Sequence, residues 1–187
     1  YNHLFGKPPM MYVRKIKEPK FKKIQEMESV NDINSDFLHQ ELKTDENTLS
    51  FWKCEQQENY KDTIKAILLS TTSIETSFFV FFDSSDIIKY GLELDDHQPG
   101  NTGYKDHENL HVNFINLTYK KIGTILELLK KCSKEQTIKL QKEDVKQYIK
   151  EVATANLLNY EKLNEQLKND IKKYKLDSSE NQQENID

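Results

Sequence analysis

The residues best suited to chemistry are His107, Glu108 and His111, which lie in the string His-Glu-Asn-Leu-His. On an α-helix, two histidines four residues apart lie on one face and can share a zinc ion. The intervening glutamate is then placed to take a proton from metal-bound water. The pattern therefore predicts a zinc-dependent metallohydrolase, provided that the segment is helical. We keep this activity as the alternative function of the chain.

The residues around this motif favour a strand over a helix. Two charged residues precede it directly, after a loop that contains proline and glycine. Apolar residues then alternate with polar ones from 110 to 116, as in a half-buried strand. On a strand the two imidazoles would lie about 13 Å apart, at a rise near 3.3 Å per residue, which is too far for one zinc ion. We therefore expect residues 107–116 to lead a strand into the next helix.

A catalytic zinc ion needs a third protein ligand. Peptidases that resemble thermolysin take it from a glutamate on a following helix, and Glu127 and Glu135 are the candidates here. Neither glutamate lies in the short sequence pattern that surrounds the third ligand in that family. The metal site predicted by the alternative function is therefore His107, His111 and Glu127, with Glu108 as the catalytic base.

Arg14 is the only arginine of the chain. Together with the polar run at 70–73 and with Glu93, it resembles the arginine, serine-x-serine and glutamate arrangement of ADP-ribosyltransferases. In that family the arginine holds the dinucleotide and the glutamate stabilises the sugar cation. The glutamate-x-glutamate loop of the family is absent from this sequence. An arginine in a surface ion pair is therefore the simpler interpretation.

Charge and cysteine content limit the class of protein. The 187 residues carry a net charge of −4, with acidic and basic residues interleaved, which argues against a domain that reads nucleic-acid bases. No apolar run approaches the roughly 20 residues that span a bilayer, and no secretory signal is visible. Cys54 and Cys132 belong to no paired motif, so we expect two partly buried thiols in a reducing, cytoplasmic setting.

The spacing of apolar residues predicts an α+β fold in which helices pack on a small mixed or antiparallel sheet. In the run at 48–54, Leu49 and Phe51 alternate with Trp52 and Cys54, so this strand should be covered on both faces. Residues 87–94 allow a helical turn or a strand. Asn59 and Thr118 are expected to cap helices. Further aromatic and β-branched runs predict strands at 10–16, 77–83, 110–116 and 137–140.

The spacing of apolar residues predicts helices at the end of the chain. We expect an α+β body at 1–140, followed at 141–176 by a helical hairpin or one bent helix. Residues 177–187 have a polar composition that predicts a disordered tail. A helical stripe between charged residues would pack on its own body, which is the commoner arrangement, or bind a partner chain. The stripe consists of Leu163, Leu167, Ile171 and Tyr174.

Three short segments, at 12–16, 47–52 and 109–112, resemble a pattern in small uncharacterised bacterial proteins, some of them encoded near defence or toxin loci. The resemblance implies an accessory protein that works with a larger partner, and it implies no catalytic residue. Together with the helical stripe, it predicts a non-enzymatic interaction subunit of a bacterial cytosolic complex that needs no cofactor. Self-association through the C-terminal helices is a further expectation.

Overall fold

A computed structural model describes residues 10–34, 36, 42, 44–54 and 60–177. All strand pairs are antiparallel, and they form one sheet in the order β4-β5-β2-β1-β3-β6. The predicted α+β fold is therefore confirmed, and the sheet is antiparallel. Its strands are β1 (Met11–Ile16), β2 (Leu49–Cys54), β3 (Ser77–Asp83), β4 (Glu93–Asp95), β5 (His111–Ile115) and β6 (Thr137–Leu140).

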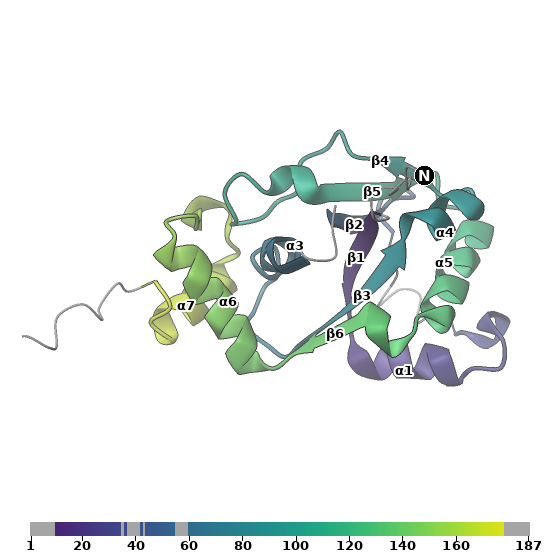
Figure 1. Ribbon diagram of the computed structural model, residues 1–187, viewed down its shortest axis with the longest axis horizontal. Helices are drawn as coiled ribbons and strands as arrows, with labels where there is room; N and C mark the ends of the chain where they lie inside the picture. Colours follow the sequence, from purple (N-terminus) through teal and green to yellow (C-terminus); the bar gives the residue numbers. More distant parts are fainter. Residues whose placement is uncertain (1–9, 35, 37–41, 43, 55–59, 178–187) are drawn as a thin grey trace, which may run out of the picture.

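Helices cover both faces of the sheet, so the molecule has three layers (Figure 1). One face carries α1 (Glu18–Glu26), α4 (Ser84–Lys89) and α5 (Tyr119–Lys131). The other face carries α3 (Tyr60–Leu68), α6 (Lys142–Thr154) and α7 (Glu165–Lys173). Short 3-10 turns join several of these elements, namely η3 (Glu108–Leu110), η4 (Lys134–Gln136) and η5 (Tyr160–Lys162).

The alternation of side chains in β2 separates two hydrophobic cores. Leu49 and Phe51 point into the core under α1 and α5, whereas Trp52 and Cys54 point into the core under α3, α6 and α7. Successive side chains of a strand face opposite sides of a sheet, and this strand is covered on both. Both cysteines are buried, as expected, and burial raises the pKa of the Cys132 thiol to about 12.

Local signals placed several boundaries correctly. Thr118 caps α5, because its hydroxyl accepts a hydrogen bond from the Lys121 amide at 3.3 Å. Residues 87–94 combine both predicted possibilities in succession, since α4 ends before Gly91 and β4 follows it. Gly91 adopts a φ of 63°, which glycine reaches without steric cost. The predicted cap at Asn59 lies outside the described residues.

The two C-terminal helices pack against the sheet, and their apolar side chains are not exposed to solvent. Leu163, Leu167 and Ile171 are at most 5% exposed and belong to the same core as Phe79 of the sheet. The interpretation of these three residues as a partner-binding surface is therefore wrong, because their side chains are already buried within the chain. Tyr174, the fourth member of the stripe, is half-buried at its edge. The predicted tail, apart from residue 177, lies outside the described residues.

Candidate functional site

The histidine motif does not form an α-helix. His107 immediately precedes the three-residue turn η3, and His111 is the first residue of β5. The segment at 107–116 therefore leads into a strand, as its alternating residues predicted. A zinc-peptidase motif depends on one continuous helical face for both imidazoles, and this backbone does not provide one.

His107 contributes to the packing of the loop at 95–110. Its imidazole stacks on the Tyr104 ring with centroids 3.8 Å apart and planes 4° apart, and its Nδ1 lies 2.7 Å from the Lys105 carbonyl oxygen. Tyr104 is buried and donates a hydrogen bond from its hydroxyl to Asp62 of α3 at 3.0 Å. His107 thus covers a tyrosine that fastens this loop to α3.

His111 has a separate environment on the sheet. Its Nδ1 lies 3.2 Å from the Gln98 carbonyl oxygen, and its ring packs edge-on against Trp52 with centroids 5.3 Å apart. Gly100 approaches both rings so closely that an added Cβ would lie 2.6 Å from the His111 Cβ and 2.7 Å from the Trp52 ring. The two histidines therefore serve different local contacts.

Glu108 forms an ion pair with the C-terminal segment. Its Oε1 lies 2.6 Å from the Lys162 ammonium, which belongs to η5 of the C-terminal segment. The hydrogen bond and charge of Lys162 lower the pKa of this carboxyl group. A general base should have a pKa close to the operating pH, so this environment suits a structural role better than proton transfer.

The predicted third zinc ligand lies in the wrong layer. Glu127 belongs to α5, which packs on one face of the sheet, whereas His111 lies with Trp52 on the other face. The proposed ligand set of His107, His111 and Glu127 is therefore wrong, because the sheet separates the glutamate from His111. Within the described part of the chain, no three His, Cys, Asp or Glu side chains are grouped so that they could hold a metal ion.

The elements of the ADP-ribosyltransferase resemblance are also dispersed. The Arg14 guanidinium lies 5.4 Å from the centre of the Phe51 ring and donates to the Ser50 carbonyl oxygen. Glu93 lies in an edge strand and pairs with Lys121. The run at 70–73 follows α3 on the opposite face of the sheet from Arg14. The structure therefore does not bring these three components together.

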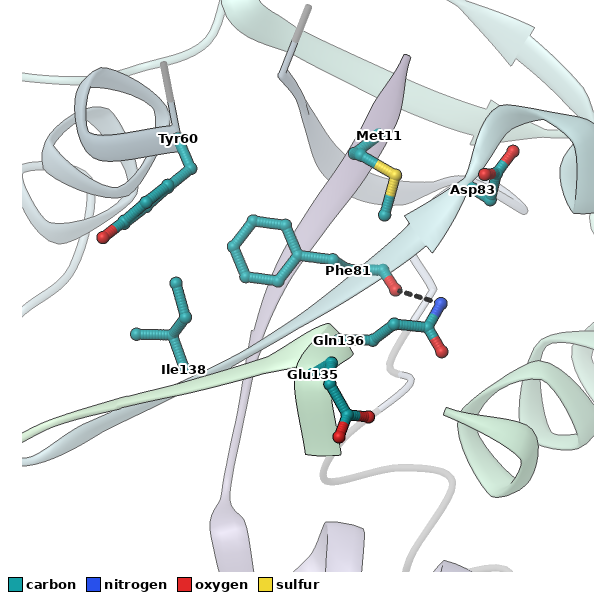
Figure 2. Close-up of a pocket in the computed structure, with 7 residues that line it drawn as sticks. All are labelled: Met11, Tyr60, Phe81, Asp83, Glu135, Gln136 and Ile138. Atoms are coloured by element: carbon teal, nitrogen blue, oxygen red, sulfur yellow. Dashed lines mark hydrogen bonds between the residues drawn. The ribbon is translucent and has the colours of Figure 1, made fainter. Parts of the chain in front are cut away.

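A cavity of about 300 Å³ opens beside β6, on the face that carries α3. Figure 2 shows the Phe81 ring between Tyr60 and Ile138 on one side and Gln136 and Asp83 on the other. We call this cavity the Phe81 pocket. Its residues come from β1, α3, β3, η4 and β6, and they are Met11, Tyr60, Phe81, Asp83, Glu135, Gln136 and Ile138.

The register of the sheet assembles the apolar part of the Phe81 pocket. Met11, the first residue of β1, pairs with Asp83, the last residue of β3. Phe81 lies two positions before Asp83 and hence on the same face of the sheet. Ile138 of β6 is paired with Phe79 of β3, which places its side chain on that face as well. The ends of three neighbouring strands therefore form one apolar surface.

Two aromatic rings meet at nearly a right angle in the Phe81 pocket. The Tyr60 and Phe81 rings lie 6.4 Å apart with an angle of 89° between their planes. Tyr60 begins α3, and it neighbours Tyr148 of α6, whose pKa is raised chiefly by burial and also by Tyr60. The ring of Tyr60 thus forms the wall of the pocket that borders the helical layer.

Two carboxylates lie at the polar end of the Phe81 pocket. Asp83 caps α4 by accepting the Ser85 amide at 2.7 Å, and Glu135 is exposed. A hydrogen bond from Ser133 lowers the pKa of Glu135, so this group is ionised at neutral pH. Gln136 closes the wall between them, since its Nε2 donates to the Phe81 carbonyl oxygen at 3.4 Å. The cavity therefore combines an apolar floor with a negatively charged rim.

Sequence reasoning did not find the Phe81 pocket, because its residues are spread from position 11 to 138 with no repeating interval. Glu135 was of interest only as an alternative zinc ligand, and it lies away from the histidine motif. The pairing of β1 with β3 was the one signal that could have placed Met11, Phe81 and Asp83 together. That pairing depends on the order of strands, which the sequence alone does not fix.

No family model, curated protein or solved structure matched this chain in our comparisons. In the described part of the chain, no helix has the length and apolar character that crossing a membrane requires.

Proposed function

We propose that this protein is a non-enzymatic interaction subunit that receives a basic side chain of a partner protein in the Phe81 pocket. The observation that carries the proposal is the combination of an apolar floor with the Asp83 and Glu135 carboxylates at one open cavity. The proposal retains the bacterial, cytosolic accessory role, with its defence or toxin context, that the sequence suggested. It moves the contact site from the C-terminal stripe to this pocket.

The chemistry of the Phe81 pocket suits lysine or arginine. Both residues carry a long apolar stem that ends in a cation, so they can bury the stem while the charge stays near water. Met11 and Ile138 offer apolar contacts for the stem. The rings of Tyr60 and Phe81 can attract a cation that lies over their faces. Asp83 and Glu135 then supply opposite charges at the rim.

The size and ionisation of the pocket support binding more than catalysis. A volume of about 300 Å³ lies at the lower end of the range for ligand pockets and has room for one large side chain. The lowered pKa of Glu135 keeps this carboxylate charged at neutral pH. It therefore suits a constant ion pair better than the transfer of a proton, which requires a pKa near the working pH.

A selection of random phage-displayed peptides on the immobilised protein tests this proposal. We expect the enriched peptides to share a lysine or arginine and to lose binding to a Glu135→Lys variant, because the variant places a like charge at the rim. Glu161→Lys is the matched control, since Glu161 is also exposed and lies in η5, away from the Phe81 pocket.

Two outcomes would contradict the proposal. One is enrichment of peptides without basic residues. The other is enrichment of basic peptides that bind the wild-type protein and the Glu135→Lys variant equally well, because such binding would be a general attraction to an acidic protein and not recognition by this pocket.

A further inference from the structure

The strand next to the Phe81 pocket is an edge of the sheet. β6 pairs with β3 on one side, and among the described residues no strand pairs with its other side. Figure 1 shows β6 as the outer strand, ahead of the turn into α6. An edge strand carries backbone N–H and C=O groups that another extended chain can bind. Ile138 belongs both to this edge and to the pocket.

We propose that the partner segment binds in an extended conformation as an added strand beside β6, with its basic residue in the Phe81 pocket. This inference rests on the proposed function and names the form in which the partner is recognised. Strand addition uses main-chain hydrogen bonds for affinity and side-chain pockets for specificity. Here the charge of Asp83 and Glu135 selects a basic segment over a neutral or acidic one.

The pleat of β6 determines which residue of an added strand reaches the pocket. Ile138 and Leu140 face the α3 side of the sheet, whereas Thr137 and Lys139 face the other side. A residue placed opposite Ile138 would lie on the same face, one strand spacing of about 4.8 Å away. Its side chain would therefore start beside the pocket. The residue before or after it would point towards the opposite face.

The opposite face does not favour a basic residue of the added strand. Lys139 and Lys22 both pair with Glu18 of α1, with 2.6 Å and 2.8 Å between ammonium and carboxylate. This cluster of two lysines and one glutamate carries a net positive charge. Selection for a basic residue is therefore expected at the pocket face only, so the recognised pattern is one basic residue within an extended segment and not a continuous basic run.

The short length of β6 explains why the pocket would be needed for binding. The strand has four residues, so it spans about 13 Å and offers few outward-facing backbone groups. Short edge strands that carry lysine also resist uncontrolled pairing with other chains. A segment without a basic side chain for the pocket would gain too few contacts to bind stably. The edge and the Phe81 pocket thus act together in this proposal.

Amide hydrogen exchange by NMR tests the added strand directly. The probe is an acetylated and amidated hexapeptide of alternating arginine and valine, and the control peptide replaces arginine by glutamate. We expect the arginine peptide to slow exchange of the outward-facing β6 amides by about tenfold or more, because new hydrogen bonds protect them. Two further peptides carry N-methyl groups on alternate amides, one on the odd positions and one on the even positions. Only one of the two should lose the ability to protect β6, since alternate backbone groups of a strand face its neighbour.

The outcomes separate this inference from the proposed function. Shifts of the Met11 and Ile138 signals without slower exchange in β6 would overturn the added strand and leave the pocket as a binding site. Equal protection by the glutamate peptide would overturn the selection of a basic residue by the pocket. Absence of any response to either peptide would overturn both. If protection of the β6 amides rises with protein concentration in the absence of peptide, the edge binds a second copy of the chain. That result would overturn the proposal that it binds a separate partner protein.

Discussion

The histidine motif at 107–111 and the Phe81 pocket both adjoin α3 on the same face of the sheet, but their polar groups differ in what they contact. In the motif, Glu108 pairs with Lys162, and both histidines contact backbone oxygens of their own loop region. In the pocket, Asp83 also caps α4, but the exposed Glu135 carboxylate lines an open cavity. The residues with the spacing of a catalytic motif thus hold the fold together, whereas a site with no sequence motif presents a carboxylate to solvent.

This comparison separates stability from binding. Changes around the histidine motif should lower the free energy of unfolding, because the contacts there hold the loop, α3 and the C-terminal segment together. A change at Glu135, the rim carboxylate that does not cap a helix, should weaken binding of basic ligands and leave unfolding unchanged, whereas a change at Asp83 should also remove the cap of α4.

Removal of the chain after Leu140 should have the largest effect. It uncovers the core around Phe79 and deletes the partners of two loop hydrogen bonds, from the Lys105 amide to Leu157 and from the Asn159 amide to Gly103. Because a domain is stable by only about 5–15 kcal/mol, we expect residues 1–140 to lose cooperative unfolding, measured by circular dichroism in urea. Truncation after Asp177 is the control and should unfold like the full chain. Cooperative unfolding of the 1–140 fragment would show that the body is independent, as its sequence suggested.

Gly100→Ala should have the next largest effect. The new methyl group would meet the His111 Cβ at 2.6 Å and the Trp52 ring at 2.7 Å, and overpacking of this kind typically costs about 1–3 kcal/mol. Gly123→Ala is the matched control, because nothing lies within 4 Å of its added Cβ in α5. Since alanine is favoured over glycine inside a helix by about 0.5–1 kcal/mol, the control should gain stability. Equal urea midpoints for both variants would contradict the close packing around His111.

The Glu108–Lys162 ion pair should contribute less, about 1 kcal/mol at most, because the Lys162 side chain is 41% exposed. Lys162 lowers the pKa of Glu108 in the folded state. The stabilisation is therefore present above the unfolded pKa of about 4.3 and is lost as the pH falls through the lowered folded value. Wild type and Glu108→Gln should differ in urea midpoint at pH 7 and converge under acid conditions.

The same unfolding measurement also tests the zinc alternative. Addition of zinc to protein purified without a metal-affinity tag should leave the midpoint unchanged, because a ligand stabilises only a state that binds it. A zinc-dependent increase that His107→Ala removes would support a metal site at the motif.

Glu135→Gln should have the smallest effect on stability and a clear effect on binding. Glu135 is exposed and lies in the η4 turn, so the urea midpoint should stay at the wild-type value. Binding of the arginine-containing hexapeptide, measured by NMR titration, should weaken because the rim loses one charge. Glu161→Gln, at an exposed glutamate outside the pocket, should change neither quantity. A large loss of stability in the Glu135 variant would mean that this carboxylate belongs to the fold, like Glu108.

Much of the secondary structure follows from short-range patterns. The alternation of Leu49 and Phe51 with Trp52 and Cys54 predicted a strand covered on both faces, because burial of each face requires its own apolar set. Thr118 predicted the start of α5, since its hydroxyl can satisfy an amide that the helix leaves unpaired. These signals lie within a few residues of the structure that they determine.

The contacts that individual side chains make were harder to predict, because their partners lie far away in the sequence. Leu167 has the same pattern whether its stripe packs on its own sheet or on another chain, and only the fold shows it to be fully buried. Glu127 follows the histidine motif at a plausible distance, yet α5 lies on the opposite face of the sheet from His111. Spacing along the chain carries no information about which layer a helix joins.

The sequence by itself determined the α+β class, the strands β1, β2, β3, β5 and β6, and the Thr118-capped start of α5, because local periodicity and capping depend on neighbouring residues. Only the tertiary structure decided that the histidine motif is a loop contact and that Met11, Phe81 and Glu135 share a cavity. The physical reason is that the order β4-β5-β2-β1-β3-β6 arises from long-range pairing, and this pairing selects which strand ends lie together.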